Sequence, residues 1–253
     1  MTEAPIFLAA STILVREQDD LEVLMVKRHH KIDFVAGAMV FPGGKLNDDD
    51  ADPAWADHVI GWAQIPEAER APRIAAIREC FEECGIILGD PGRIAPGPET
   101  LALRKAVDRR EVRFIDAVRA NGVVLDLSRL TLFSRWLTPA VVPKRFDTFF
   151  YLAAAPARQD ALSDGRETVE AEWIAPAHAL ELARAREREI VFPTRMNLGL
   201  LAQTETLDAA FEAARSRAPR TVLPSIITRG GDRYLQLAVD DGYGAVEELL
   251  ELP

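Results

Sequence analysis

The sequence contains little cysteine, little histidine and no export signal. Two cysteines, Cys80 and Cys84, occur among 253 residues, together with four histidines. Two cysteines four residues apart in a segment typical of a helix do not make a disulfide framework, and they lack the further ligands that a zinc site needs. Residues 1–10 carry Glu3 instead of a basic stretch, and their apolar run is too short for a signal peptide or a membrane span. We therefore expect a protein of the reducing cytoplasm that does not bind membranes.

Basic residues are also in short supply. Lysine and arginine number 30 against 40 aspartates and glutamates, which gives a formal net charge of −10. Binding to a nucleic-acid backbone normally requires a basic face, so nucleic acid is excluded as the main partner. Acidic residues are better suited to holding cations. At 48% hydrophobic residues, the chain can still bury an ordinary core.

The pattern of hydrophobic residues predicts a mixed α/β protein. Internal repeats, low-complexity tracts and flexible linkers are absent from the sequence, so we expect one domain over residues 1–253, with an extension from about residue 190 that is partly helical. The sequence gives no information on the oligomeric state. Strands on both sides of helices favour an α/β/α sandwich with a mixed sheet. The expected strands are residues 6–15, 21–27, 37–41, a stretch around Trp136, 147–153, 172–174 and 234–239, and the expected helices are 101–120, 175–187 and 197–217.

One further helix carries most of the chemical information. Pro72 is typical of a helix start, and the spacing of Ile74, Ile77 and Phe81 predicts an amphipathic helix that stops near Gly85. The segment before it, residues 51–72, is rich in alanine, tryptophan and proline and has no clear period. We interpret that segment as a partly helical insertion.

Three glutamates lie on one face of this helix. Glu79, Glu82 and Glu83 occupy positions i, i+3 and i+4, so their carboxylates project together. Crowded like charges are unfavourable unless a hard divalent cation bridges their oxygens, and Mg²⁺ or Mn²⁺ is the natural choice. The alternative is a solvated acidic surface, which is common on helices. The surrounding residues favour the metal site.

These surroundings resemble the Nudix box, the signature of the Nudix hydrolases. The segment Arg78-Glu79-Cys80-Phe81-Glu82-Glu83-Cys84-Gly85-Ile86 matches its second half throughout, and Phe41-Pro42-Gly43-Gly44-Lys45 resembles its start. The first half departs from the pattern, because Asp50 stands at the position of the family's glutamate and 27 residues separate Asp50 from Arg78. About twenty residues are therefore inserted. Asp50, Glu67 and Glu69 are all candidates for the partner of Arg78.

The resemblance implies a role for each matching residue. In this family the box glutamates bind divalent ions that hold a diphosphate, and a metal-activated water attacks phosphorus. By position, Glu79, Glu82 and Glu83 would be ligands of Mg²⁺ or Mn²⁺, and the carbonyl of Gly43 would complete the set. Glu79 is also the candidate base, and Arg78 would orient the glutamates. A further catalytic acid often precedes a late strand, where Glu167 is the first choice and Glu170 the second.

A longer resemblance points to the Nudix subgroup that contains the peroxisomal coenzyme A diphosphatase, whose box also carries an insertion. It rests on the divided box, on Trp136-Leu137-Thr138-Pro139 and on Arg145-Phe146-Asp147-Thr148-Phe149-Phe150. The implied substrate is a small-molecule diphosphate, coenzyme A (CoA) or acyl-CoA, and a cation such as Lys144 would suit its 3′-phosphate. Other CoA-cleaving members carry a Ser and a Leu-Arg pair where this chain has His29 and Ile32-Asp33. ADP-ribose or a dinucleotide is the alternative substrate, and a catalytically silent nucleotide sensor is the alternative function.

Overall fold

A mixed eight-stranded sheet forms the centre of the computed structural model, which describes residues 4–29, 37–94, 98–157, 159–163, 165, 168–218 and 220–250. The strand order is β10-β2-β1-β9-β8-β11, with β3 beside β2 and β4 beside β1. The pairs β1–β9 and β8–β11 are parallel and the others are antiparallel. The strands are β1 (Ile6–Glu17), β2 (Leu21–Arg28), β3 (Met39–Val40), β4 (Gly43–Lys45), β8 (Thr131–Leu137), β9 (Arg145–Ala154), β10 (Thr168–Ile174) and β11 (Thr221–Val222).

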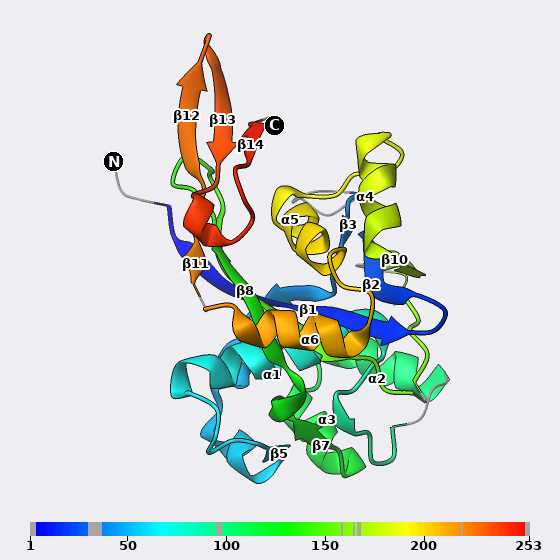
Figure 1. Ribbon diagram of the computed structural model, residues 1–253. Helices are drawn as coiled ribbons and strands as arrows, with labels where there is room; N and C mark the ends of the chain where they lie inside the picture. The colour runs from blue at the N-terminus through cyan, green and yellow to red at the C-terminus, as the bar shows by residue number, and fades with distance from the viewer. Residues whose placement is uncertain are drawn as a thin grey trace.

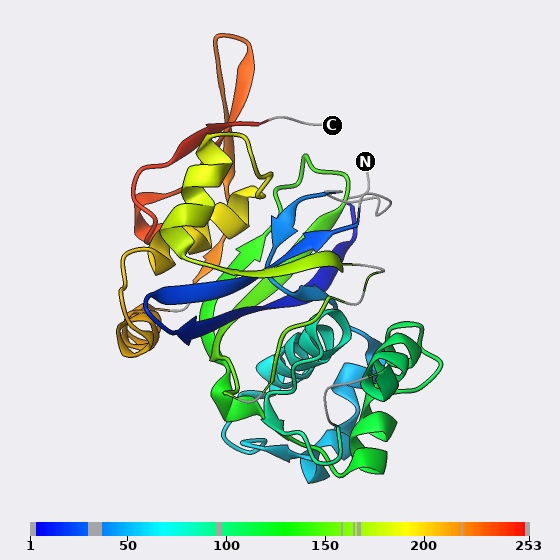
Figure 2. The ribbon, with the colours of Figure 1, turned by 90° about the vertical axis from the view of Figure 1, so that its right-hand side faces the viewer.

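Helices cover both faces of this sheet (Figures 1 and 2). Strand β1 shows why, because its side chains alternate between two cores: Ala10 and Leu14 enter the core on the α1 side, and Ile13 and Val15 enter the other. A sheet that buries both faces needs a helical layer on each. One layer holds α1 (Glu67–Cys84), α2 (Pro98–Asp108) and α3 (Phe114–Asn121), and the other holds α4 (Pro176–Arg184), α5 (Phe192–Leu201) and α6 (Leu207–Ser216). The predicted α/β/α sandwich is confirmed.

The predicted start of helix α1 is wrong. The helix begins at Glu67 after Pro66, and Pro72 lies inside it. Pro72 lacks the N–H that would bond to the carbonyl of residue 68, but packing of the helix against the sheet outweighs that single lost bond. Much of the segment 51–72 is nevertheless irregular, as expected for the insertion. It contains the end of η1 (Asp48–Ala51), η2 (Pro53–Asp57) and β5 (Val59–Ile60). Strand β5 pairs with β7 (Val124–Asp126), which also pairs with β6 (Gly89–Asp90), and the three strands form a small separate sheet.

Trp55 anchors this segment. Its side chain is fully buried, its ring lies 5.6 Å from that of Phe114 on α3, and its Nε1 donates a 2.9 Å hydrogen bond to the carbonyl of Asp49. The segment around residues 48–60 is therefore packed against the helices on the α1 side of the main sheet. This places Asp50, which precedes Trp55, next to helix α1.

The C-terminal part contains more strand than expected. Where one short strand was predicted, β12 (Ser225–Arg229), β13 (Asp232–Gln236) and β14 (Glu247–Leu249) form a three-stranded sheet. The β12–β13 hairpin turns at Gly230 and Gly231, whose φ angles of 64° and 98° suit the tight turn, and it projects away from the main sheet (Figure 1). The short helices η3 (Leu127–Arg129) and η4 (Val239–Asp241) complete the described elements. Within the described part of the chain, every helix is too short or too polar to cross a membrane.

Candidate active site

The loop between β3 and β4 lies directly over the acidic helix. The carbonyl of Pro42 accepts a 2.8 Å hydrogen bond from the backbone N–H of Thr12, so the loop is fixed to β1. A Cβ atom at Gly44 would lie 2.5 Å from Oε1 of Glu79. A larger residue at Gly44 would therefore require the carboxylate of Glu79 to shift. At Gly43 the close neighbours are Ser11 and Ala10 of β1, so the two glycines let this segment lie between β1 and the acidic face of α1.

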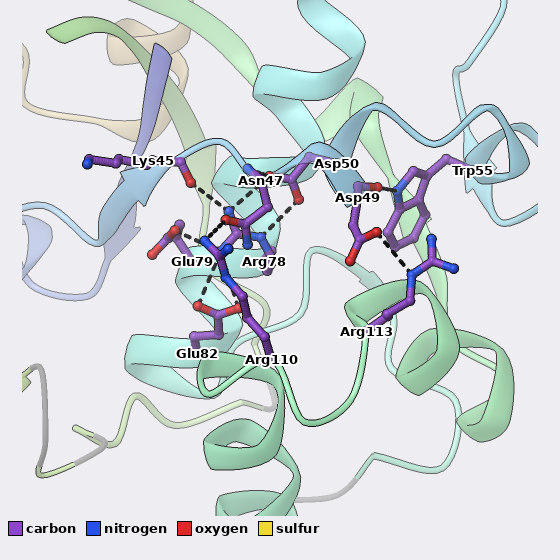
Figure 3. Close-up of polar contacts among 10 residues, drawn as sticks. All are labelled: Lys45, Asn47, Asp49, Asp50, Trp55, Arg78, Glu79, Glu82, Arg110 and Arg113. Atoms are coloured by element: carbon purple, nitrogen blue, oxygen red, sulfur yellow. Dashed lines mark hydrogen bonds and ion pairs between the residues drawn. The ribbon is translucent and has the colours of Figure 1, made fainter. Parts of the chain in front are cut away.

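Arg78 is the centre of a buried charge network (Figure 3). Its Nε and Nη2 atoms each donate a 2.9 Å hydrogen bond to the carboxylate of Asp50, and Nη2 also donates to the carbonyl of Lys45 at 2.8 Å. On the other side, Nη1 bonds to Glu79 at 2.7 Å and to both oxygens of Glu82 at 3.2 Å. The side chains of Arg78 and Asp50 are only 4% and 1% exposed. Bidentate pairing of this kind fixes both partners in position.

Asp50 is thus the partner of Arg78 among the three candidates from the sequence. Glu69 instead pairs with Arg73, one turn further along α1, at 2.7 Å. Glu67 is exposed in the first turn of the helix. The shorter aspartate serves at the position of the family's glutamate because η1 brings its backbone close to the helix.

The network holds more negative than positive charge. Burial raises the pKa of Glu79 and of Glu82, and the negative charge of Glu79 raises that of Glu82 further. For Arg78, burial opposes the positive charge, but Glu79, Asp50 and Glu82 outweigh this effect and raise its pKa well above the ordinary value. Arg78 is therefore always charged, and the two glutamates share one cation. A second positive charge at this place would be strongly favoured.

The side chain of Glu83 contacts Gly43, the first residue of β4. Its Oε2 accepts a 3.0 Å hydrogen bond from the backbone N–H of Gly43, and the residue is 3% exposed. Because the helix ends at Cys84, the carbonyls of its last turn need partners from elsewhere. Arg104 donates to the carbonyl of Glu82, and the hydroxyl of Thr168 donates to that of Glu83. The end that carries the glutamates is therefore fixed by α2 and β10.

A cleft of about 600 Å³ opens beside this network. Its polar part contains the acids Glu79, Glu82 and Asp108 and the cations Arg28, Lys45, Arg78, Arg110 and Lys144. Its remaining wall is largely apolar and comes from β8, β9, the start of α5 and the C-terminal segment. That wall includes Trp136, Leu137, Pro139, Val142, Phe146, Phe192, Pro193, Leu235 and Leu250. The cleft thus combines a charged end with a broad apolar surface.

The structure brings most of the predicted site residues together. Arg78, Glu79 and Glu82 form one network, and Glu83 and Gly43 are joined by a hydrogen bond. In this arrangement, no three acidic, histidine or cysteine side chains among the described residues form a ready set of metal ligands. The reason is that Glu79 and Glu82 face Arg78 while Glu83 faces the loop.

Of the two candidates for the late acid, only Glu170 lies in the described part of the chain, and it is not part of this network. Glu167 lies outside the described residues, as do Ile32 and Asp33. Glu170 is 43% exposed and pairs with Lys27 at 3.6 Å and with Arg188 at 3.8 Å, so it serves as a surface ion-pair residue on β10.

Two lining residues were missed by the sequence interpretation. Asp108 ends α2, and its negative charge contributes to the raised pKa values of Glu79 and Glu82. Arg110 follows with a φ of 58°, which is unusual for a residue other than glycine, and donates a 2.6 Å hydrogen bond to Oδ1 of Asn47. Both residues looked like the charged end of an amphipathic helix. Only the folded arrangement of α2 over α1 assigns them to the cleft.

Comparison with known proteins agrees with this geometry. The family model of the NUDT19 Nudix domain matches residues 61–199 of this sequence. The chain is 29% identical over 207 residues to the acyl-coenzyme A diphosphatase NUDT19 of Xenopus laevis, which covers 64% of this chain and 54% of that protein. It is 26% identical over 281 residues to human acyl-coenzyme A diphosphatase NUDT19, with coverage of 92% of this chain and 75% of that protein. The chain thus spans about half the length of the Xenopus relative.

A solved structure shares the fold. The crystal structure of a Nudix hydrolase from Alicyclobacillus acidocaldarius superposes with a TM-score of 0.73 at 26% identity, covering 83% of this chain and 96% of that one. The likeness therefore includes most of both chains, not the acidic helix alone.

The Arg78–Asp50 pair gives a direct test of the network. Replacing Asp50 by alanine leaves the Nε–Nη2 edge of a buried guanidinium without its partner, so we expect the free energy of unfolding to fall by about 3–5 kcal/mol. Asp49→Ala is the matched control, because Asp49 pairs with Arg113 at the surface, where both side chains are more than two-fifths exposed. Its loss should stay below about 1 kcal/mol. Denaturant unfolding of both variants measures the difference, and equal losses would contradict the proposed importance of the buried pair.

Proposed function

The chain belongs to the Nudix hydrolase family through its NUDT19-type Nudix domain, and on that premise we propose that it hydrolyses the diphosphate linkage of coenzyme A or an acyl-CoA with the help of Mg²⁺ or Mn²⁺. The observation that carries the substrate proposal is the composition of the cleft. Carboxylates, five cations and a broad apolar wall line one space. A substrate that combines phosphates with a long organic arm suits all three features.

The donor set fits a hard divalent cation. Glu79 and Glu82 reach the cleft with carboxylate oxygens, Glu83 lies on the same helix face, and the carbonyl of Gly43 is the proposed additional ligand. When bound, the cation would neutralise charge on the diphosphate and lower the pKa of a water molecule. The excess negative charge around Arg78 supports this assignment, since a bound cation would relieve the repulsion between Glu79 and Glu82.

The chain's own residues would then hold and orient the substrate. Arg78 fixes Glu79 and Glu82 through its Nη1 atom and is itself fixed by Asp50. Glu79 is the proposed base because of its position in the box and because it lines the cleft, where burial raises the pKa of its carboxyl group. Lys45 and Arg110 both line the cleft and would contact the negatively charged phosphates. Glu167 stays the proposed further acid.

Other lining residues of the cleft would determine which diphosphate is bound. Lys144 is the proposed contact for the 3′-phosphate of CoA, a group that ADP-ribose and NADH lack. The apolar wall would receive the pantetheine arm and an attached acyl chain, because burial of their methylene groups is favourable.

Product analysis tests this assignment. CoA, two acyl-CoAs, ADP-ribose, NADH and a diadenosine polyphosphate are each incubated with the protein and Mg²⁺ or Mn²⁺, and the products are identified by mass. We expect adenosine 3′,5′-bisphosphate and a phosphopantetheine product from CoA and acyl-CoA, and no activity after complete chelation of the metal. A higher kcat/KM for ADP-ribose or NADH would contradict the CoA assignment. Absence of turnover with every substrate would favour a silent nucleotide sensor.

Glu83→Gln separates a metal ligand from a solvated acid. The substitution is nearly isosteric, and the glutamine oxygen can still accept the hydrogen bond from Gly43, so the thermal midpoint should change little. We expect kcat to fall by about two to three orders of magnitude, as is typical when one preorganised electrostatic contact is lost. Glu67→Gln is the matched control, since Glu67 is an exposed acid on the same helix. Turnover within about twofold of the wild type in both variants would remove Glu83 from the proposed ligand set.

A further inference from the structure

A second cavity, of about 210 Å³, lies on the α4–α6 side of the main sheet. It is bounded by β8, by the segment after α6 and by the turn that follows η4. Phe133 and Leu200 contribute apolar surface, and the polar lining side chains are Ser134, Arg135, Arg217, Arg220, Asp240, Asp241 and Tyr243. Trp136, which lines the catalytic cleft, is not among its lining residues. The cavity is therefore a separate site.

Arg217 has an unusual environment in this cavity. Its guanidinium stacks on Phe133 with 4.2 Å between Cζ and the ring centroid. Within the described part of the chain, its Nε and Nη2 atoms are both buried and neither has a hydrogen-bond partner. Buried donors without acceptors are rare and unfavourable, and those of a charged group especially so. The described residues thus supply no acceptor for this edge of Arg217.

Two other arginines show what this edge normally binds. Arg135 donates from Nε and Nη2 to the two oxygens of Asp147 at 2.8 and 2.6 Å, and Arg78 uses the same edge for Asp50. The planar fork of Nε and Nη2 matches two oxygens of a carboxylate or phosphate. Arg217 offers the same fork without such a partner.

The two acids that line the cavity are already engaged. Asp241 accepts a 2.9 Å hydrogen bond from the backbone N–H of Ala238, and Asp240 pairs with Arg220 at 3.7 Å. Neither is bonded to Arg217, so within the described residues the Nε–Nη2 edge of Arg217 has no carboxylate partner. Burial also lowers the pKa of Arg217, which is the expected effect on a buried cation that lacks a paired anion.

We propose that this cavity binds a small oxyanion, a carboxylate or a phosphate group, on the Nε–Nη2 edge of Arg217. The volume of about 210 Å³ restricts the ligand to a small molecule or to one end of a larger one. The site is connected to the catalytic cleft through one contact. Tyr243 lines the cavity, and its hydroxyl accepts a 3.2 Å hydrogen bond from Nε1 of Trp136. An anion beside Tyr243 would thus lie one residue away from the wall of the cleft.

Calorimetric titration of the metal-free full-length protein tests the proposal. Inorganic phosphate and acetate are titrated separately at constant ionic strength, so the two arms distinguish the two kinds of oxyanion. We expect saturable binding of at least one of them to the wild type. Arg217→Met retains the length of the side chain but removes the fork, and Arg217→Lys retains the charge without the fork. Both should weaken binding by about tenfold or more, because each loses two charge-assisted hydrogen bonds.

Arg215→Met is the matched control. Arg215 lies near the end of α6, stacks on Phe211 and does not line the cavity, so its replacement should leave the affinity unchanged. Thermal unfolding of each variant shows whether it is folded, and Arg217→Met should be no less stable because it removes unpaired buried donors. Binding of equal strength in Arg217→Met and the wild type, as expected for an anion bound at Lys45 or Lys144, would overturn the proposal. Absence of saturable binding to the wild type would overturn it as well, since water then satisfies Arg217.

Discussion

The structure around the acidic helix depends on the buried guanidinium of Arg78. Its Nε and Nη2 atoms donate to Asp50, and its Nη1 atom donates to Glu79 and Glu82. A buried arginine is tolerated only when its donors are satisfied, so the acids on both sides must be held in place. Glu79 and Glu82 are held by the helix itself, whereas Asp50 is separated from Arg78 by 27 residues. The intervening chain must therefore return to the helix, and the packing of Trp55 on Phe114 secures that return.

The same network explains the chemistry we assign to the cleft. A single arginine cannot neutralise three surrounding carboxylates, and Asp108 adds a fourth acid to the space. Such a surplus of buried negative charge is unfavourable in the protein alone and becomes favourable when a divalent cation binds. Gly44 contributes to this arrangement because it has no side chain, so its backbone lies against the carboxylate of Glu79. Helix, loop and insertion thus combine to place the carboxylates that we propose as metal ligands beside a broad apolar wall.

Much of this arrangement follows from local sequence patterns. The β-rich run of residues 6–15 and the spacing of Ile74, Ile77 and Phe81 predict β1 and the apolar side of α1, because both depend on near neighbours in the chain. The predicted start of α1 was wrong. Pro72 is typical of the first residue of a helix, and only tertiary packing keeps it inside α1. The partner of Arg78 and the cleft position of Asp108 and Arg110 depend on contacts between distant segments. A single sequence contains no local signal for such contacts.

Direct measurement of metal binding tests the central claim without relying on turnover. Mn²⁺ is titrated into metal-free protein and the free ion is measured by electron paramagnetic resonance, for the wild type and for a Glu79→Gln/Glu82→Gln double variant. The account predicts saturable binding by the wild type that is weakened by at least about a hundredfold in the double variant, because two charged ligands are lost. The double variant should still unfold cooperatively, since both glutamine oxygens can accept hydrogen bonds from Arg78. Equal affinity for Mn²⁺ in the two proteins would contradict the assignment of this helix as the metal site.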